Sequence, residues 1–174
     1  MNRTVNQIAI TILIWVFLLG CSVIKPKQDP NSKSTQFPPP IGVVNDFENI
    51  LSRSAEATLK LTIDDHIELS DDEIAIVTTD TLWGYDDIFS CSLALANEWG
   101  VGKKDKNNGV VIFFSAKLRE IRIQNGDGVI ARLTDSETQV IIDKYMISQF
   151  KKGEYYEGLQ AGLDQIVMHL QETK

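Results

Sequence analysis

The stretch Trp99 to Gly128, WGVGKKDKNNGVVIFFSAKLREIRIQNGDG, decides the fold. Its centre is the apolar run from Val110 to Phe114, which is too short for a helix and rich in β-branched and aromatic side chains. This run predicts a strand buried on both faces. From Glu120 to Asn125 apolar and polar side chains alternate strictly, which predicts a half-buried strand at a sheet edge. A four-residue loop over 116–119 would join the two strands into an antiparallel hairpin.

The predicted hairpin brings two polar loops together. If Ser115 faces Glu120, the register continues until Asn108 faces Asp127 and Asn107 faces Gly128. The oxygen-bearing side chains of these loops belong to Asp105, Asn107, Asn108 and Asp127. Carboxylate and amide oxygens are the hard ligands that Ca²⁺ and Mg²⁺ prefer, so a divalent cation site is one interpretation. Asn-Asn-Gly and Gly-Asp-Gly are also ordinary turn sequences, and a pair of plain turns is the alternative.

A second candidate site lies at the other end of the predicted sheet. The apolar run from Ile74 to Thr79, a helix from about Tyr85 to Glu98 and the strand from Val110 form a βαβ unit, which predicts parallel strands. Open α/β sheets bind ligands at the carboxyl ends of their strands. The residues expected at that end are Thr78, Thr79, Asp80 and Ser115. Residue chemistry alone does not choose between the two ends.

The remaining pattern predicts three further helices. Ser52 caps the first, which carries apolar residues to Ile63 and is followed by an acidic loop over 64–73. The capping box of Thr134 to Glu137 opens the next. The last begins near Tyr155, and Gly158 and Gly162 are expected to let it approach the sheet closely. Cys91 lies within the helix of the βαβ unit and is expected to be a small buried apolar residue.

Composition excludes some functions. The chain has 174 residues, 24 acidic and 17 basic, with a formal net charge of −7. Nucleic acid is not expected as a partner, because phosphate binding needs clustered Lys and Arg. Cations suit this charge better, but a solvated acidic surface is the simpler explanation of it. The two histidines have no Cys or acidic neighbours at zinc-ligand spacing, and no nucleophile with its base is recognisable.

The amino-terminal segment indicates export. Arg3 precedes an apolar run from Ile8 to Leu19, and Leu18-Leu19-Gly20-Cys21 resembles a bacterial lipobox, in which the cysteine is lipidated. Residues 1–21 are therefore expected to be a lipoprotein-type signal segment, and a lipid on Cys21 would hold the protein on the periplasmic side of the cell envelope. Since Ser22 follows, the resemblance implies the outer membrane. An uncleaved membrane anchor and an ordinary secretory signal are the alternatives.

A proline-rich segment separates this signal from the fold. All five prolines lie between residues 22 and 41, among Lys, Gln, Asn and Ser, a composition that cannot bury a core. We expect residues 22–41 to be an extended tether and residues 42–174 to form one domain.

Several motifs together resemble a known family. They are Val44-x-Asp46, Trp99-Gly100-Val101-Gly102, Asn107-Asn108-Gly109, Arg119, Arg122-Ile123, Gly126-x-Gly128, Leu133-x-Asp135 and Phe150-x-x-Gly153-x-Tyr155. In order and spacing they resemble the TPM domain over residues 43–170. The resemblance implies a three-layer α/β/α sandwich, whose mixed sheet has a βαβ unit followed by an antiparallel hairpin strand. It marks Trp99, Gly102, Gly109, Gly126 and Gly128 as structural positions and adds Asp46 to the candidate metal ligands.

The resemblance also suggests two functions. Family members include a thylakoid-lumen phosphatase of photosystem II repair and bacterial domains that bind Ca²⁺ or Mg²⁺. This chain departs from the family at Gln124 and Ile130, where members carry Glu, and Asp127 stands where Tyr is common. One hypothesis is a membrane-tethered periplasmic domain that binds Ca²⁺ or Mg²⁺ near Asp46, Asp105, Asn107, Asn108 and Asp127, with weak phosphatase activity. The other is a non-catalytic module that binds an envelope protein during membrane-protein maintenance or envelope assembly.

Overall fold

The computed structural model describes residues 37–172. Its elements are β1 (Val44–Asp46), α2 (Arg53–Leu69), β2 (Glu73–Thr78), α3 (Ile88–Trp99), β3 (Gly109–Ser115), β4 (Glu120–Asn125), α4 (Asp127–Ile130), α5 (Asp135–Ile141), the π-helical turn η2 (Ile142–Met146), α6 (Ile147–Phe150) and α7 (Tyr155–Glu172). No helix in this range is long and apolar enough to cross a bilayer. The predicted signal segment, Cys21 and most of the predicted tether lie outside the described residues.

The four strands form one mixed sheet in the order β1-β2-β3-β4. β1, β2 and β3 are parallel, and β4 pairs antiparallel with β3. In the hairpin Ser115 faces Glu120 and Val110 faces Asn125, so the predicted register is confirmed. The strand β1 was not predicted, because three residues carry too short a pattern to recognise.

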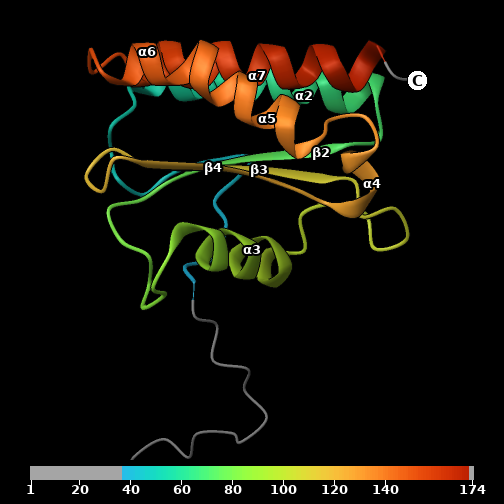
Figure 1. Cartoon of the computed structure of the whole chain (residues 1–174), viewed down its shortest axis with the longest axis horizontal. Coiled ribbons are helices and arrows are strands. Elements are labelled where there is room, and N and C mark those ends of the chain that lie inside the picture. Colours follow the sequence, from blue (N-terminus) through green and yellow to red (C-terminus); the bar gives the residue numbers. More distant parts are fainter. Residues whose placement is uncertain (1–36, 173–174) are drawn as a thin grey trace, which may run out of the picture. The chain divides into compact units, whose positions relative to one another are not determined.

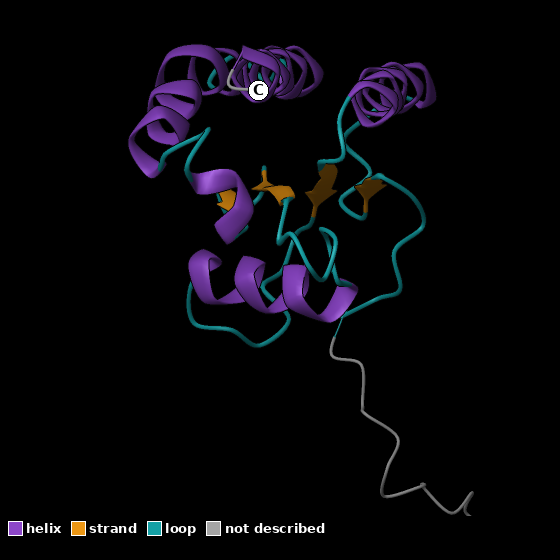
Figure 2. Ribbon diagram, turned by 90° about the vertical axis from the view of Figure 1, so that its right-hand side faces the viewer, coloured by secondary structure: helices purple, strands orange, loops and turns teal. Residues whose placement is uncertain are grey.

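Helices cover both faces of the sheet, as the α/β/α prediction required (Figure 1). α2 and the segment from α5 to α7 lie on one face, and α3 lies on the other; Figure 2 shows this arrangement along the strands. Alternate residues of β3 serve the two cores: Ile112 packs with the residues of α2 and α7, and Phe113 packs with Cys91 and Leu95 of α3. The connection from β1 to β2 through α2 and the connection from β2 to β3 through α3 move in the same direction across the sheet. Because α2 and α3 lie on opposite faces, the two connections have opposite handedness.

Two details of the helices differ from expectation. α2 continues to Leu69 instead of ending before an acidic loop, because His66 lies one turn after Ile63 and is only 1 % exposed, which extends the buried face. Gly158 and Gly162 do not face the sheet. A Cβ at Gly158 would meet the Phe150 ring, and one at Gly162 would meet the Met146 side chain. These glycines therefore allow α7 to pack closely on η2 and α6.

Part of the predicted tether packs against the domain. Phe37 is only 4 % exposed, stacks on Tyr85 and meets Trp83 edge to face. The indole Nε1 of Trp99 donates a hydrogen bond to the carbonyl of Pro38 at 3.1 Å. The packed chain therefore includes residues before the predicted boundary at 42.

Candidate functional site

The two predicted loops meet at the amino-terminal edge of β3. The Gly128 amide donates to the carbonyl of Asn107 at 3.1 Å, and the Gly126 amide donates to the carbonyl of Gly109 at 2.8 Å. These bonds continue the hairpin ladder beyond Val110 and Asn125. The predicted juxtaposition of Asn107 and Gly128 is therefore present.

Glycines make this close approach possible. A Cβ added at Gly128 would lie 1.9 Å from the carbonyl oxygen of Lys106, and one at Gly126 would lie 2.1 Å from that of Asn107. A Cβ at Gly109 would lie 2.2 Å from the carbonyl oxygen of Val101. Backbone meets backbone at all three positions, so a side chain would force the loops apart.

Asn108 holds the edge together and is not available as a ligand. Its side chain is buried; Oδ1 accepts from the Lys103 amide at 2.8 Å, and Nδ2 donates to the carbonyl of Asp71. These bonds join the loop before β3 to the loop before β2. The sequence could not distinguish this role from metal ligation, because an amide oxygen serves either.

Asp46 lies at the carboxyl ends of the parallel strands, opposite the end where the two loops meet. This position removes Asp46 from the five predicted metal ligands. It ends β1, beside Thr78, whose Oγ1 donates to its Oδ1. It also accepts from the amides of Ile50 at 3.2 Å and Leu51 at 2.8 Å, and so fixes the turn after β1. Because β1 runs parallel to β2 and β3, its carboxyl end cannot reach the loop that precedes β3.

Lysines dominate the exposed part of the loop before β3. Lys103 and Lys106 both pair with Asp71, and these two cations lower the pKa of its carboxyl to about 2. Asp105 is exposed between Lys104 and Lys106, and no described residue pairs with it. The cationic neighbours weaken Asp105 as a ligand for a divalent cation.

A hollow of about 320 Å³ lies beside the loops on the α3 side of β4, and we call it the amino-edge hollow. Its oxygen-bearing lining side chains are Asn97, Asn107, Gln124, Asn125, Asp127 and Asp135. Asp127 and Asp135 are exposed and have no hydrogen-bond or ion-pair partner among the described residues. The Gln124 Oε1 atom is buried and also lacks a partner within the described range. The hollow is therefore lined by two carboxylates without partners and by Gln124, whose side-chain oxygen accepts no hydrogen bond from a described residue.

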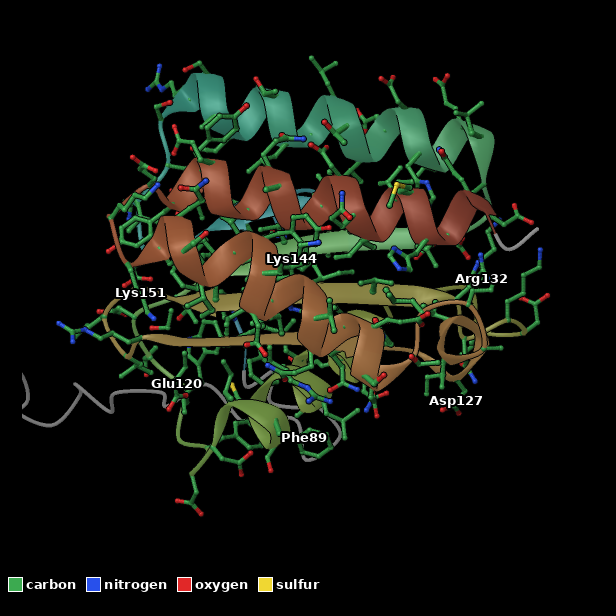
Figure 3. All side chains as sticks on the ribbon, turned by 45° about the horizontal axis from the view of Figure 1, so that its top comes forward. Phe89, Glu120, Asp127, Arg132, Lys144 and Lys151 are labelled. Atoms are coloured by element: carbon green, nitrogen blue, oxygen red, sulfur yellow. The ribbon has the colours of Figure 1, made fainter. Side chains whose placement is uncertain are left out.

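Sequence reasoning missed Asp135 and Gln124 as members of this hollow. Asp135 begins α5 after the short α4 turns the chain back, and the pattern of residues does not reveal where that turn points. Arg122 also lines the hollow, with its guanidinium 5.0 Å from the centre of the Phe89 ring. Figure 3 labels Asp127 at the lower right of the view and Phe89 near its bottom, on α3.

The rival residues at the carboxyl end of the sheet serve the fold. Thr79 and Ser115 are buried; Thr79 Oγ1 donates to the carbonyl of Thr81 at 3.0 Å, and Ser115 Oγ accepts from the Leu118 amide at 3.1 Å. Asp80 pairs with Lys117 at 2.9 Å. The bonds of Thr79 and Ser115 therefore close local turns, whereas the Asp80–Lys117 pair joins the segment after β2 to the β3–β4 loop.

A buried polar network near the end of α2 was also not predicted. Arg132 makes two hydrogen bonds of 2.6 and 2.7 Å to Asp72, and this carboxylate raises the pKa of Arg132. Ser70 Oγ lies 2.9 Å from Nε2 of the buried His66. The network borders a cavity of about 510 Å³ and ties α2 to the chain after α4. Its residues lie far apart in the sequence, so no local motif signals it.

No group of three or more His, Cys, Asp or Glu side chains in the described range is arranged to hold a metal ion. A cation in the amino-edge hollow would therefore depend on two carboxylates together with amide oxygens and water. This donor set fits a hard cation such as Ca²⁺ or Mg²⁺ and does not fit zinc.

Comparison with known proteins supplies a family. A family model described as the TPM domain matches residues 44–169. Nothing among curated proteins matches the chain. The solution structure of the N-terminal domain of a protein from P. gingivalis is similar to this chain, with a TM-score of 0.69 and 29 % identity, and the match covers 75 % of this chain and 83 % of that one.

Two further solution structures share the fold. The BA42 protein of the psychrophilic bacterium Bizionia argentinensis has a TM-score of 0.63 and 21 % identity, covering 72 % of this chain and 85 % of its own. The N-terminal domain of the cg2496 protein of Corynebacterium glutamicum has a TM-score of 0.57 and 14 % identity, covering 84 % and 87 %.

Proposed function

The chain belongs to the TPM domain family, and we propose that this domain binds a divalent cation, Ca²⁺ or Mg²⁺, in the amino-edge hollow. The observation that carries the proposal is that Gln124, whose Oε1 atom is buried without a described partner, lines the hollow together with Asp127 and Asp135. A buried acceptor without a donor costs free energy, and a cation would satisfy it. Asn107 supplies another amide oxygen at the same place.

The donor set predicts weak binding. Ca²⁺ takes six to eight oxygens and Mg²⁺ six, so two carboxylates leave several positions to water. The Arg122 guanidinium at the hollow opposes a cation as well. We expect dissociation constants on the order of 10⁻⁴ to 10⁻³ M, as in cation sites of extracellular modules.

NMR titration of the purified chain with CaCl₂ and with MgCl₂ tests this proposal. We expect the amide signals of Asn107, Gln124 and Asp127 to shift, and the Asp127→Asn variant to bind at least about tenfold more weakly because it loses a charged ligand. Asp65→Asn, an exposed carboxylate on α2, is the matched control and should bind like the unmodified chain. Unmoved signals at the hollow at about 10 mM cation would refute the proposal.

The phosphatase activity suggested by the family resemblance remains a prediction. A bound cation could polarise a phosphoryl oxygen, but we assign no described residue as nucleophile or base. We expect weak hydrolysis of a generic phosphomonoester that needs the cation and is lost in Asp127→Ala. Equal turnover by the variant would assign the activity to a contaminant.

We also propose that the domain is tethered to a membrane through lipid on Cys21, on the periplasmic side of the outer membrane. The support is the sequence pattern that ends at Leu18-Leu19-Gly20-Cys21. Metabolic labelling with radioactive palmitate should mark the protein, and Cys21→Ser should lose the label. Labelling that persists in the variant would exclude this anchor.

A specific observation favours the second candidate, an interaction module for an envelope protein. Phe89, Leu93 and Ile130 are 48 %, 38 % and 40 % exposed, and all three line the amino-edge hollow. Crosslinking in envelope preparations should capture one specific protein, and Phe89→Ser should abolish its capture. Equal capture by the variant would reject this surface. The Asp127→Asn variant distinguishes the two candidates. Cation binding needs the Asp127 carboxylate, whereas capture of a partner by a purely apolar surface does not.

A further inference from the structure

A second concave site lies at the opposite edge of the sheet, where the β3–β4 loop meets the start of α7. It has a volume of about 580 Å³, within the range of small-molecule sites. We call it the carboxyl-edge groove. Glu120 and Lys151, which both line it, are labelled at one end of the molecule in Figure 3, far from Arg132 and Asp127 at the other end.

The floor of this groove is aromatic. The rings of Phe114 and Phe150 stack with their centres 4.2 Å apart, and Tyr155 lies 5.5 Å from Phe114. Phe114 is only 3 % exposed, whereas Phe150 and Tyr155 are half-buried. A planar ring laid on this floor would gain apolar contact area together with ring–ring attraction.

The rim of the groove is cationic, although the chain as a whole carries a net charge of −7. Three basic side chains line it, Arg119, Lys151 and Lys152, against one carboxylate, Glu120. Lys152 is engaged by Gln149 and Glu154, but Arg119 and Lys151 have no partner among the described residues. Two unused cations above an aromatic floor favour an anion that carries a ring.

The backbone supports the same reading. Arg119 has a φ of +59°, a left-handed conformation that a non-glycine residue rarely adopts and that glycine would adopt at lower cost. Tyr155 begins the 18-residue α7, whose first amides have no partner within the helix and add positive potential at the rim.

We propose that the carboxyl-edge groove binds small aromatic anions, with the ring on Phe114, Phe150 and Tyr155 and the phosphate or carboxylate between Arg119 and Lys151. The residues that bear the charge come from the hairpin loop and from the end of α6. The site is independent of the amino-edge hollow, because the two lie at opposite ends of β3 and share no residue.

NMR titration of the full chain with phenyl phosphate, phenol, benzoate and inorganic phosphate tests the proposal. Phenyl phosphate should shift the amides of Ala116, Arg119, Lys151 and Gly153 and bind at least about tenfold more tightly than phenol or inorganic phosphate, because only it uses both floor and rim. Benzoate should lie between them, because it carries one negative charge. Raising the salt concentration should weaken phenyl phosphate binding and leave phenol unaffected.

Variants separate the two parts of the site. Arg119→Gly removes the guanidinium and suits the positive φ, so the hairpin should stay folded while phenyl phosphate affinity falls about tenfold. Lys151→Gln, at an exposed position, should give a similar loss, and Lys104→Gln at the far edge should have no effect. Equal affinity for phenol and phenyl phosphate, shifts confined to other surfaces, or unchanged binding by the Arg119→Gly/Lys151→Gln chain would each overturn the proposal.

Discussion

Replacing Gly128 by alanine tests whether the two loops at the amino-terminal edge are in contact. Gly128 lies in the short helix α4 and has no positive φ. On helix propensity alone, Gly128→Ala should therefore stabilise the protein by about 1 kcal/mol. The structure predicts the opposite sign, because the new Cβ would lie 1.9 Å from the carbonyl oxygen of Lys106.

The expected cost follows from this contact. Normal carbon–oxygen contacts are more than 1 Å longer, so the loops must separate by about that distance. Separation breaks the 3.1 Å bond from the Gly128 amide to Asn107, worth about 1 kcal/mol, and overpacking costs typically 1–3 kcal/mol. After the gain of about 1 kcal/mol in helix propensity, the net loss is about 1–3 kcal/mol.

Urea unfolding followed by tryptophan fluorescence measures this difference. Gly162→Ala is the matched control: it is also helical, but the nearest atoms to its Cβ would belong to the flexible side chain of Met146 instead of to the backbone, so the loss of stability should be smaller than that of Gly128→Ala. If Gly128→Ala is as stable as the unmodified chain or more stable, the loops are not packed as described.

Three further predictions concern other parts of the domain. Burial raises the pKa of the Cys91 thiol to about 11. Iodoacetamide at pH 8 should therefore modify Cys91 only when urea is present, as measured by mass spectrometry of the peptide that contains it. Rapid labelling of the folded chain would contradict this burial. Thr134→Ala should cost about 1 kcal/mol in urea unfolding, because Thr134 caps α5. Hydrogen bonds from the backbone amide and hydroxyl of Thr134 lower the pKa of Glu137. The stability that these bonds add is present above the ordinary Glu pKa and is lost as the pH falls through the lowered pKa. Glu137→Gln should remove this loss of stability at acid pH, and an unchanged pH dependence would refute the assignment. Asp72→Asn should lower the free energy of unfolding by about 3 kcal/mol, because it leaves Arg132 without its counter-charge. The double variant Asp72→Asn/Arg132→Met should recover part of this loss. No recovery in thermal unfolding would argue against the ion pair as the cause.

Local pattern was sufficient wherever the physical cause is local. The alternation in β4 and the apolar run of β3 have periods that the strand geometry imposes, and the loop length then leaves one hairpin register. The capping box at Thr134 and the start of α7 at Tyr155 follow from backbone groups within one turn. The short β1 and the end of α2 depend on what they pack against, so the same reasoning missed them.

The candidate sites required the tertiary structure. The sequence determined that this is an α/β domain with a hairpin whose loops meet, since periodicity and turn chemistry act between near neighbours. Only the folded chain decided that Asp46 ends β1 at the far edge, that Asn108 is bound to Asp71 and Lys103, and that Gln124 and Asp135 share a hollow with Asp127. Crossover direction and side-chain partners set these placements, and both depend on contacts between residues distant in the chain.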